Sequence, residues 1–427
     1  MSIIWTEDVG IIVRLIYNWQ TPTNIWNIAE NLCLYVVAKA NLRFFSADIQ
    51  RATKIRSKTA KQVSDAKFVI SHDSVVDLAN RKVSDWLTSY LEYNENHEAT
   101  SKLHFRIGAT LISAALKRQI YMERIRYKLY PNLYVLLVAD SGTARKSIAM
   151  DTGIALLKDA VPDLFYISGT LTPEGLIKHL NREKTIIKTT EHGRKVEIQY
   201  DSHVIIHADE LAECFGYDRT RASKFTMLLT KIYGAQSEHT HTIASEDQIK
   251  LRNLYPVFLG GSDPRNLRVL PEESVGGLIG RIIMVAEDKR KKNVAWESDE
   301  DRDAANARRE LLKYDLHTIS CLSGEVKPTP EARDLFAHWY EEISTMDIVD
   351  RRISAFRERC HDTALKLAMI LKVSHDDDLT LGAKYVERAI KYIERQLPEF
   401  SKVADWAATS EYAQNRARFI EFLRRQN

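Results

Sequence analysis

The sequence has few cysteines and few glycines, and it has no long apolar run. Its 427 residues include 4 cysteines and 16 glycines. No two cysteines form a C-x-x-C pair, which argues against a zinc site or a disulfide framework and fits a reducing compartment. No apolar stretch reaches the ~18 residues of a membrane span, and no basic leader precedes an apolar run near the start. These absences predict a cytoplasmic protein with no signal peptide and no membrane partner.

A strong excess of one charge is also lacking. The chain has 61 Lys and Arg against 58 Asp and Glu, a net charge of +3. Any surface that binds nucleic acid therefore has to be a local patch. A hydrophobic content of 44% and a charged content of 28% are typical of a soluble globular protein, and the length predicts two or three domains.

One stretch has the layout of a phosphate-binding loop. Leu133 to Val138 are six apolar residues without polar alternation, which predicts a strand covered on both faces. Small and polar residues follow around Gly142, and then come Lys146 and Ser147. A helix is predicted next from apolar residues at helical spacing, namely Met150, Ile154, Leu157 and Val161. Strand, small-residue loop, Lys-Ser and helix is the order in which ATP-binding loops are built.

Each part of this stretch has a chemical role in that interpretation. The loop backbone would surround phosphate oxygens with N–H groups, which come from Ser141, Gly142, Thr143, Ala144 and Arg145. Lys146 would supply a positive charge to the phosphates, and the Ser147 hydroxyl would ligate Mg²⁺. The pattern G-x-x-x-x-G-K-[ST] expects glycine at positions 140 and 145, where this chain has Asp140 and Arg145. An ordinary strand-to-helix turn remains the alternative interpretation.

Two further apolar strands end in polar residues. Val204 to Ala208 are followed by Asp209 and Glu210, so Asp209 is a candidate for holding Mg²⁺ and Glu210 for activating water. A solvated acidic turn is the alternative. The strand from Tyr255 ends at Ser262, which is placed to sense the γ-phosphate.

The order of predicted elements favours an α/β fold with a P-loop NTPase core sheet and helical domains on either side. Two more strands are predicted, at 164–169 and 282–285. A helical lead-in is predicted over 96–130, and three helices are predicted after Pro328. The expected domains are a helical, partly basic domain at 1–95, an ATPase core with inserted hairpins at 96–326, and a helical domain at 327–427.

Several basic segments are candidates for binding nucleic acid. A hairpin is predicted over 184–200 and carries Lys188, Arg194 and Lys195; the segment after Glu210 carries Arg219 and Arg221. A decorative insertion is the alternative for the hairpin. Near the start, helices are predicted over 5–19 and 25–37, and a basic segment over 43–67 indicates either a DNA-binding helix or a solvated face.

His239 and His241 are two residues apart on a predicted strand, and a second hairpin is predicted over 240–252. Their spacing allows either metal binding or a polar strand face.

The motifs and their order resemble those of P-loop ATPases from phages, plasmids and other mobile elements, the primase/helicase or replicative-helicase proteins. The resemblance covers roughly residues 100 to 400. It is carried by Tyr130-Pro131-Asn132, the S-G-x-x-R-K-S loop, Ser168-Gly169-Thr170, Thr172-Pro173-Glu174-Gly175, Asp209-Glu210, Gly260-Gly261-Ser262-Asp263-Pro264, Gly276 to Arg281, and His361-Asp362. It implies a RecA/AAA-like core, ATP and Mg²⁺ as cofactors, DNA as partner, and a ring-shaped homo-oligomer, expected to be hexameric.

The expected activity is therefore that of an ATP-dependent DNA helicase or translocase acting in replication. Arg281 follows three glycines and is expected to reach the ATP of a neighbouring subunit; a structural arginine is the alternative. An ATP-gated DNA-binding adaptor that does not unwind DNA, and a nucleotide-binding structural protein without a DNA role, remain as alternative functions.

Overall fold

The computed structural model describes most of the chain. The described residues are 81–181, 201–216, 218–241, 249–269, 277–296, 298–346 and 351–408, with the short strands β1 (Ile3–Ile4), β2 (Val13–Arg14), β7 (Thr185–Lys188) and β8 (Lys195–Ile198). They belong to two compact units, residues 1–81 and residues 82–427. The second unit contains both the segment expected as the ATPase core and the segment expected as a helical C-terminal domain.

In the first unit, β1 and β2 pair antiparallel, with Ile3 opposite Arg14 and Ile4 opposite Val13. A helix was expected across 5–19, and this prediction is wrong at the two residues of β2. Three of the four paired residues are β-branched, which favours a strand over a helix. The rest of the predicted helices and the basic segment 43–67 lie outside the described residues.

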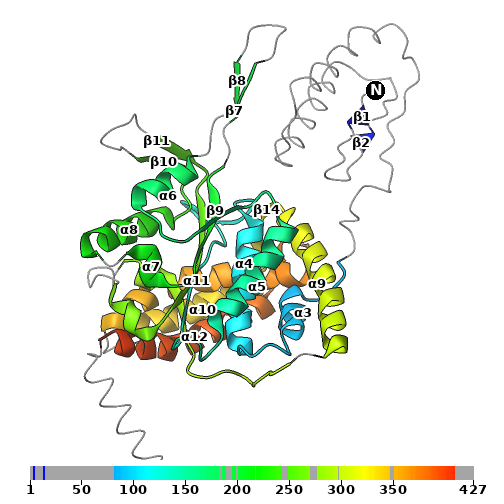
Figure 1. The fold of residues 1–427 in the computed structure, drawn as a ribbon. Helices are drawn as coiled ribbons and strands as arrows, with labels where there is room; N and C mark the ends of the chain where they lie inside the picture. The colour runs from blue at the N-terminus through cyan, green and yellow to red at the C-terminus, as the bar shows by residue number, and fades with distance from the viewer. Residues whose placement is uncertain are drawn as a thin grey trace, which may run out of the picture. The chain divides into compact units, whose positions relative to one another are not determined.

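The second unit is built on a sheet of five parallel strands (Figure 1). The strands are β5 (Tyr134–Val138), β6 (Phe165–Ser168), β9 (His203–Ala208), β12 (Tyr255–Ser262) and β13 (Ile282–Ala286). All five were predicted from apolar runs, and the α/β class is confirmed. Their order across the sheet is β13-β5-β12-β9-β6. The strand that ends in Ser262 therefore lies between the strand before the loop and the strand before Asp209.

The register aligns the carboxyl ends of the three central strands. Ser262 pairs with Val138 of β5, and Gly260 pairs with Ala208 of β9. Every residue of β5, β12 and β13 is buried, as expected for strands covered on both faces. The segments that follow these strands consequently leave the sheet at the same edge.

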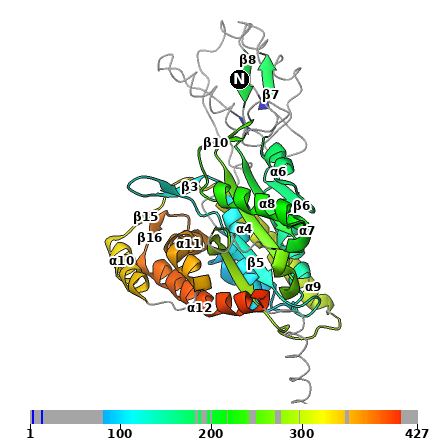
Figure 2. The same cartoon turned by 90° about the vertical axis from the view of Figure 1, so that its left-hand side faces the viewer.

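Helices from both ends of the unit cover the sheet. The helices packed together beside β5 and β12 are α3 (Trp86–Tyr93), α4 (Ser101–Leu116), α5 (Lys146–Ala160) and α9 (Asp299–Ser320). The helices of the carboxyl end are α10 (Pro330–Thr345), α11 (Arg351–His375) and α12 (Ala383–Ala408). The latter group lies away from α6 (Pro173–Leu180), α7 (Leu211–Phe215) and α8 (Arg219–Ile232) (Figure 2).

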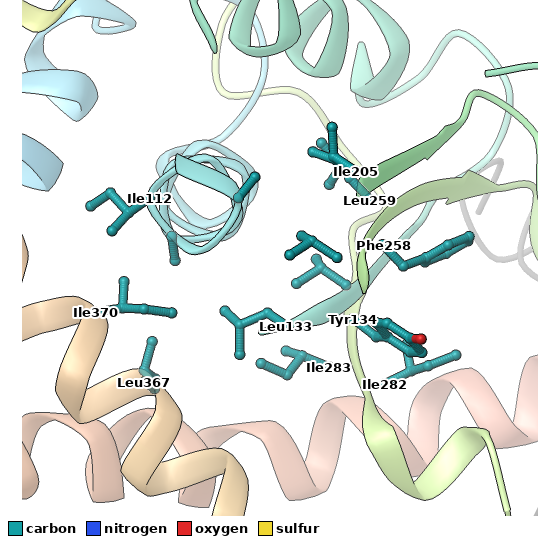
Figure 3. Close-up of a cluster of buried hydrophobic side chains, with 14 of the residues drawn as sticks. Ile112, Leu133, Tyr134, Ile205, Phe258, Leu259, Ile282, Ile283, Leu367 and Ile370 are labelled. Atoms are coloured by element: carbon teal, nitrogen blue, oxygen red, sulfur yellow. The ribbon is translucent and has the colours of Figure 1, made fainter. Parts of the chain in front are cut away.

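The core joins these layers without a break. Ile112 of α4, Ile370 of α11 and Leu133, one residue before β5, belong to one cluster of buried side chains (Figure 3). All three side chains are fully or almost fully buried. Burial of each such side chain contributes about 1.5–3 kcal/mol to the stability of the fold. The carboxyl-terminal helices, which supply Ile370, are therefore an integral part of this core.

Several predicted local features are confirmed. Thr172 caps α6 by accepting the backbone N–H of Gly175, with Pro173 in the first turn. The two predicted hairpins form, as β7 with β8 and as β10 (Glu238–His241) with β11 (Ile249–Arg252).

The lead-in over 96–130 was only partly predicted correctly. Helix α4 ends at Leu116, where Lys117 takes a positive φ of 51°. The chain then forms an antiparallel hairpin of β3 (Ile120–Glu123) and β4 (Lys128–Leu129) in place of the expected helix. Alternating polar and apolar residues, with Ile120 and Met122 buried, favour this strand.

Helix α9 was not predicted. Its first half is mostly exposed and charged, so it lacks the apolar spacing that marks an amphipathic helix. The start signal is nevertheless in the sequence: Ser298 accepts the N–H of Asp301, and three acidic residues fill the first turn. The remaining short elements are η1 (Pro264–Val269), η3 (Ile279–Arg281), β14 (Gly324–Glu325), β15 (Lys327–Pro328) and β16 (Thr380–Leu381).

A buried lysine ties α11 to the sheet. Lys366 donates to the backbone carbonyl of Asn132 at 3.1 Å and to its side-chain oxygen at 2.8 Å. Its ammonium also lies 3.8 Å from the centre of the Tyr233 ring. Burial lowers the pKa of Lys366 to about 7, although the nearby Asp362 opposes this shift. Because Asn132 lies two residues before the start of β5, this contact holds α11 against the beginning of that strand.

We expect Lys366 to make stability rise with pH. Between pH 7 and the ordinary lysine pKa of ~10.4, the unfolded chain binds a proton that the folded chain does not. The free energy of unfolding should therefore increase by up to about 1.4 kcal/mol per pH unit over that range, relative to Lys366→Met. Urea denaturation at several pH values measures this difference. Lys372→Met removes another ammonium of α11, which pairs with Asp376, and the unfolding free energy of this variant should still rise with pH. Equal slopes of unfolding free energy against pH for wild type and Lys366→Met would contradict the lowered pKa of Lys366.

Candidate functional site

The loop between β5 and α5 has Arg145 where the phosphate-loop pattern has a glycine, but its backbone there has a conformation that glycine favours. Gly142 has a φ of +73°, and no atom lies within 4 Å of the position a side chain would take. Arg145 takes the left-handed conformation, with φ 55° and ψ 30°. This is the position at which the phosphate-loop pattern has its second glycine, and a non-glycine residue there costs ~1–2 kcal/mol. At position 145 the backbone therefore has a conformation that glycine adopts without strain.

The side chain of Arg145 is held away from the loop. Its Nε donates to Glu98 Oε2 at 2.6 Å, and Glu98 also accepts from Arg290 and from the N–H of Val294. These hydrogen bonds lower the pKa of Glu98, the one from Val294 most strongly. Arg145 thus contributes its backbone to the loop, while its charge is paired outside it.

Lys146 begins α5 and reaches back across the loop. Its side chain is almost completely buried, and its ammonium donates to the carbonyl of Ala139 at 3.1 Å. Ser147 follows in the exposed first turn of the helix. Of the other loop residues, Thr143 donates its N–H to the carbonyl of Asp140, and Ala144 packs into the core. A single carbonyl of the loop therefore holds the lysine at the edge of the sheet.

The predicted residues at the ends of β9 and β12 meet. The Ser262 hydroxyl lies 3.1 Å from Glu210 Oε1 and 3.0 Å from the carbonyl of Asp263, and it can donate its one proton to either. The N–H of Asp263 donates to Glu210 Oε2 at 3.1 Å. Both carboxylate oxygens of Glu210 are thus positioned by the tip of the central strand, and each keeps a further lone pair.

Asp263 is a site residue that the sequence reasoning missed. It is 4% exposed, and Arg265 binds both of its carboxylate oxygens at 2.8 Å. The Arg265 guanidinium lowers the pKa of Asp263 to about 2. One of these oxygens also accepts the loop N–H of Ser141 at 3.3 Å. Asp263 therefore joins the loop to the tip of β12; its place directly after Ser262 was the only signal in the sequence.

Asp209 faces a second group of polar side chains. Its Oδ1 lies 3.2 Å from His207 Nε2, and Asp151 Oδ1 lies 4.0 Å from the same nitrogen. Burial lowers the pKa of His207, and burial together with Asp209 raises the pKa of Asp151. These residues line a pocket of about 230 Å³ that also reaches Glu210. Neither His207 nor Asp151 was predicted, because each lies inside a segment that looks like an ordinary core strand or helix.

The donor set at this edge fits a phosphate and a hard cation. Lys146 supplies an ammonium, while the Ser147 hydroxyl and the Asp209 carboxylate supply the oxygen ligands that Mg²⁺ prefers. The open space at Gly142 leaves room beside the loop backbone.

The other predicted residues lie elsewhere. Arg281 directly precedes β13, so it lies at the amino-terminal end of the parallel strands, opposite to the end that carries the loop. There it donates to the carbonyl of Gly277 at 2.6 Å and lies over the Tyr233 ring. Gly280 beside it has no positive φ; a Cβ there would lie 2.5 Å from the carbonyl of Ala355, so this glycine allows close packing on α11.

The nucleic-acid candidates are spread over two elements. Lys188 and Lys195 are paired directly across β7 and β8, and Arg219 begins α8. Arg221 donates to the carbonyl of Leu171 at 2.7 Å and so holds α8 to the segment after β6. Arg194 lies outside the described residues.

The alternative uses considered for other residues find little support in the described part of the chain. The group Asp151, His207 and Asp209 is the one cluster there with metal-ligand geometry, and it does not include His239 or His241. No helix among the described residues is long and apolar enough to cross a membrane.

No protein-family model and no curated protein matches the sequence.

We expect Gly261→Ala to disturb the site through packing alone. An added Cβ would lie 2.7 Å from the carbonyl oxygen of Asp209 and 3.2 Å from the Lys146 side chain. The backbone of β9 cannot yield freely, so the change should destabilise the fold by about 1–3 kcal/mol. Gly234→Ala, where no atom lies within 4 Å of the new Cβ, is the matched control and should stay within about 0.5 kcal/mol of wild type. Equal denaturation midpoints for both variants would show that the contact at Gly261 is not tight.

Proposed function

We propose that this protein is an ATP-driven helicase or translocase acting on DNA, with a RecA/AAA-like P-loop core. The observation that carries the proposal is the convergence of the Lys146–Ser147 helix start with the Glu210–Ser262 pair at one edge of the sheet. The strand order supports it, because β12 separates β5 from β9 and so places a polar tip between the loop and the carboxylates. DNA as the substrate and a role in replication are proposed from the resemblance of the motifs to those of mobile-element helicases.

The residues at this edge suit ATP hydrolysis. The Lys146 ammonium exchanges the Ala139 carbonyl for phosphate oxygens, and the loop N–H groups and the start of α5 bind the remaining oxygens. Ser147 and Asp209 would hold Mg²⁺, which would neutralise charge on the phosphates. Glu210 would accept a proton from the attacking water, and the hydrogen bonds from Ser262 and Asp263 orient its carboxylate for this role.

The basic hairpin supports an anionic partner. Lys188 and Lys195 are directly opposite in the β7–β8 register. Binding of such basic residues to a DNA backbone would neutralise phosphates and release their counterions.

ATP turnover measured with and without single-stranded DNA tests this function. We expect wild type to be stimulated by DNA and to separate a forked duplex. Lys146→Ala should lose turnover, and Glu210→Gln should bind ATP but hydrolyse it at least ~100-fold more slowly, because the amide is not a base. Lys313→Ala, a surface lysine of α9 paired with Glu310, is the control. DNA-stimulated turnover without strand separation would instead indicate the ATP-gated adaptor, and normal turnover in Lys146→Ala would remove the ATPase assignment.

Arg281 is proposed to act on the ATP of a neighbouring subunit. It lies at the amino-terminal end of the strands, whereas the loop of the same chain lies at their carboxyl end, so it cannot reach the phosphates of an ATP bound to its own loop. An arginine supplied from a second subunit stabilises the charge that spreads over the γ-phosphate, typically by 10³–10⁵-fold in rate. Such a role requires a ring or another head-to-tail assembly.

Mixing subunits tests this role. Arg281→Ala alone should bind ATP but lose most turnover, and adding Lys146→Ala subunits should restore part of it, because mixed assemblies contain some complete sites. Arg359→Ala removes a neighbouring arginine whose charge acts on Arg281, and it should retain turnover. Wild-type turnover in Arg281→Ala, or a protein that remains monomeric with ATP at all concentrations, would favour the structural alternative.

A further inference from the structure

The pocket beside Asp209 contains a side-chain group that the proposed ATP chemistry does not use. Asp151 comes from the second turn of α5, and His207 comes from β9, two residues before Asp209. Each of the three offers one ligand atom, and these atoms all lie within 4.8 Å of one another. The pocket next to them, about 230 Å³, has room for water molecules as well as an ion.

His207 is the residue that points to a ligand. Its side chain is 97% buried, and its Nδ1 lies 2.7 Å from the Tyr166 hydroxyl. Its Nε2 is buried and has no hydrogen-bond partner, although Asp209 Oδ1 lies 3.2 Å away. A buried polar atom without a hydrogen bond costs about 1–3 kcal/mol. This nitrogen faces the two carboxylates, where a cation would satisfy it.

We propose that Asp151, His207 and Asp209 form a site for a divalent transition-metal ion of the Zn²⁺ or Mn²⁺ type. Ligand atoms ~2.0–2.2 Å from such an ion lie roughly 3–4 Å apart. The observed separations of 3.2 and 4.0 Å match this spacing. An imidazole nitrogen beside two carboxylates suits these metals and does not suit Mg²⁺, which prefers oxygen. Three protein ligands leave the remaining positions open to water in the pocket.

The surroundings of the histidine also fit a metal ligand. A histidine that binds metal through Nε2 donates its Nδ1–H to a neighbouring acceptor, which fixes the ring. The Tyr166 hydroxyl oxygen is placed to accept that hydrogen bond. The ammonium of Lys158, 3.6 Å from the centre of the Tyr166 ring, holds the tyrosine in turn. Bound metal would link α5, the helix that begins with Lys146, to β9.

This site shares Asp209 with the proposed Mg²⁺–ATP site but does not rest on ATP hydrolysis. Its two other ligands, His207 and Asp151, have no part in the ATP chemistry proposed above. The nucleotide-free protein is therefore expected to bind the metal. Lys146→Ala should keep this affinity, so the metal site and the ATPase function can fail independently of each other.

Metal titration of the nucleotide-free, full-length protein tests the proposal. Co²⁺ serves as the probe through its visible absorption, and calorimetry with Zn²⁺, Mn²⁺ and Mg²⁺ gives the affinities. Wild type should bind about one equivalent of Co²⁺, which Zn²⁺ displaces and equimolar Mg²⁺ does not. His207→Gln and Asp151→Asn should each weaken binding by at least ~10-fold. Tyr166→Phe, which keeps the ring and removes the acceptor, should weaken it by ~10-fold.

Matched controls come from the same two elements. His203→Gln replaces a histidine at the other end of β9, and Asp159→Asn replaces an exposed aspartate two turns further along α5. Both should bind Co²⁺ as wild type does. Asp151 is exposed, so Asp151→Asn is expected to fold even if His207→Gln does not. Unchanged Co²⁺ affinity in Asp151→Asn, or Mg²⁺ competing as well as Zn²⁺, would overturn the proposal.

Discussion

The close approach of β12 to its neighbours at Gly261 determines the geometry of the candidate site. Only a residue without a side chain lets the carbonyl of Asp209 come as near as it does, and the same gap admits the Lys146 side chain. One residue further on, Ser262 hydrogen-bonds with Glu210 while Ala139 donates its N–H to the Ser262 carbonyl. The loop and the carboxylates are therefore positioned by the same strand tip. A shift in β12 would move both halves of the site together.

Most of the fold could be predicted because burial leaves a simple signal in sequence. Strands β5, β9, β12 and β13 are buried along almost their whole length, so they are largely apolar runs, unlike the sequence of a surface helix. Helix α9 was missed because its exposed first half has no apolar stripe. The β3–β4 hairpin was missed because Ile120 was assigned to the apolar face of the preceding helix, although its alternation with Met122 favours a strand. The order of the strands was not predicted, because parallel strands are joined by long crossovers and the local sequence of a strand does not indicate which strands it pairs with.

The candidate site was predictable only where a polar residue ends a strand or lies in the segment that leads from the strand to the next helix. Lys146, Asp209, Glu210 and Ser262 were identified in this way, and the structure brings the last two into contact. His207, Asp151 and Asp263 depend on contacts between segments far apart in the chain, and a polar residue inside an apolar run does not reveal its partner. The bidentate pair of Asp263 with Arg265 is local in sequence, but its link to the loop at Ser141 is not.

Arg145 shows how a residue other than glycine can be held in the left-handed conformation. Glycine at position 145 would reach the left-handed conformation without strain, whereas Arg145 requires ~1–2 kcal/mol to be supplied from elsewhere. Its hydrogen bond to Glu98 provides a compensating interaction, and Glu98 is itself fixed by Arg290 and by the N–H of Val294. The conformation of the loop thus depends on the segment after β13 as well as on its own residues. A glycine would have left the loop independent of that segment; the arginine couples the two.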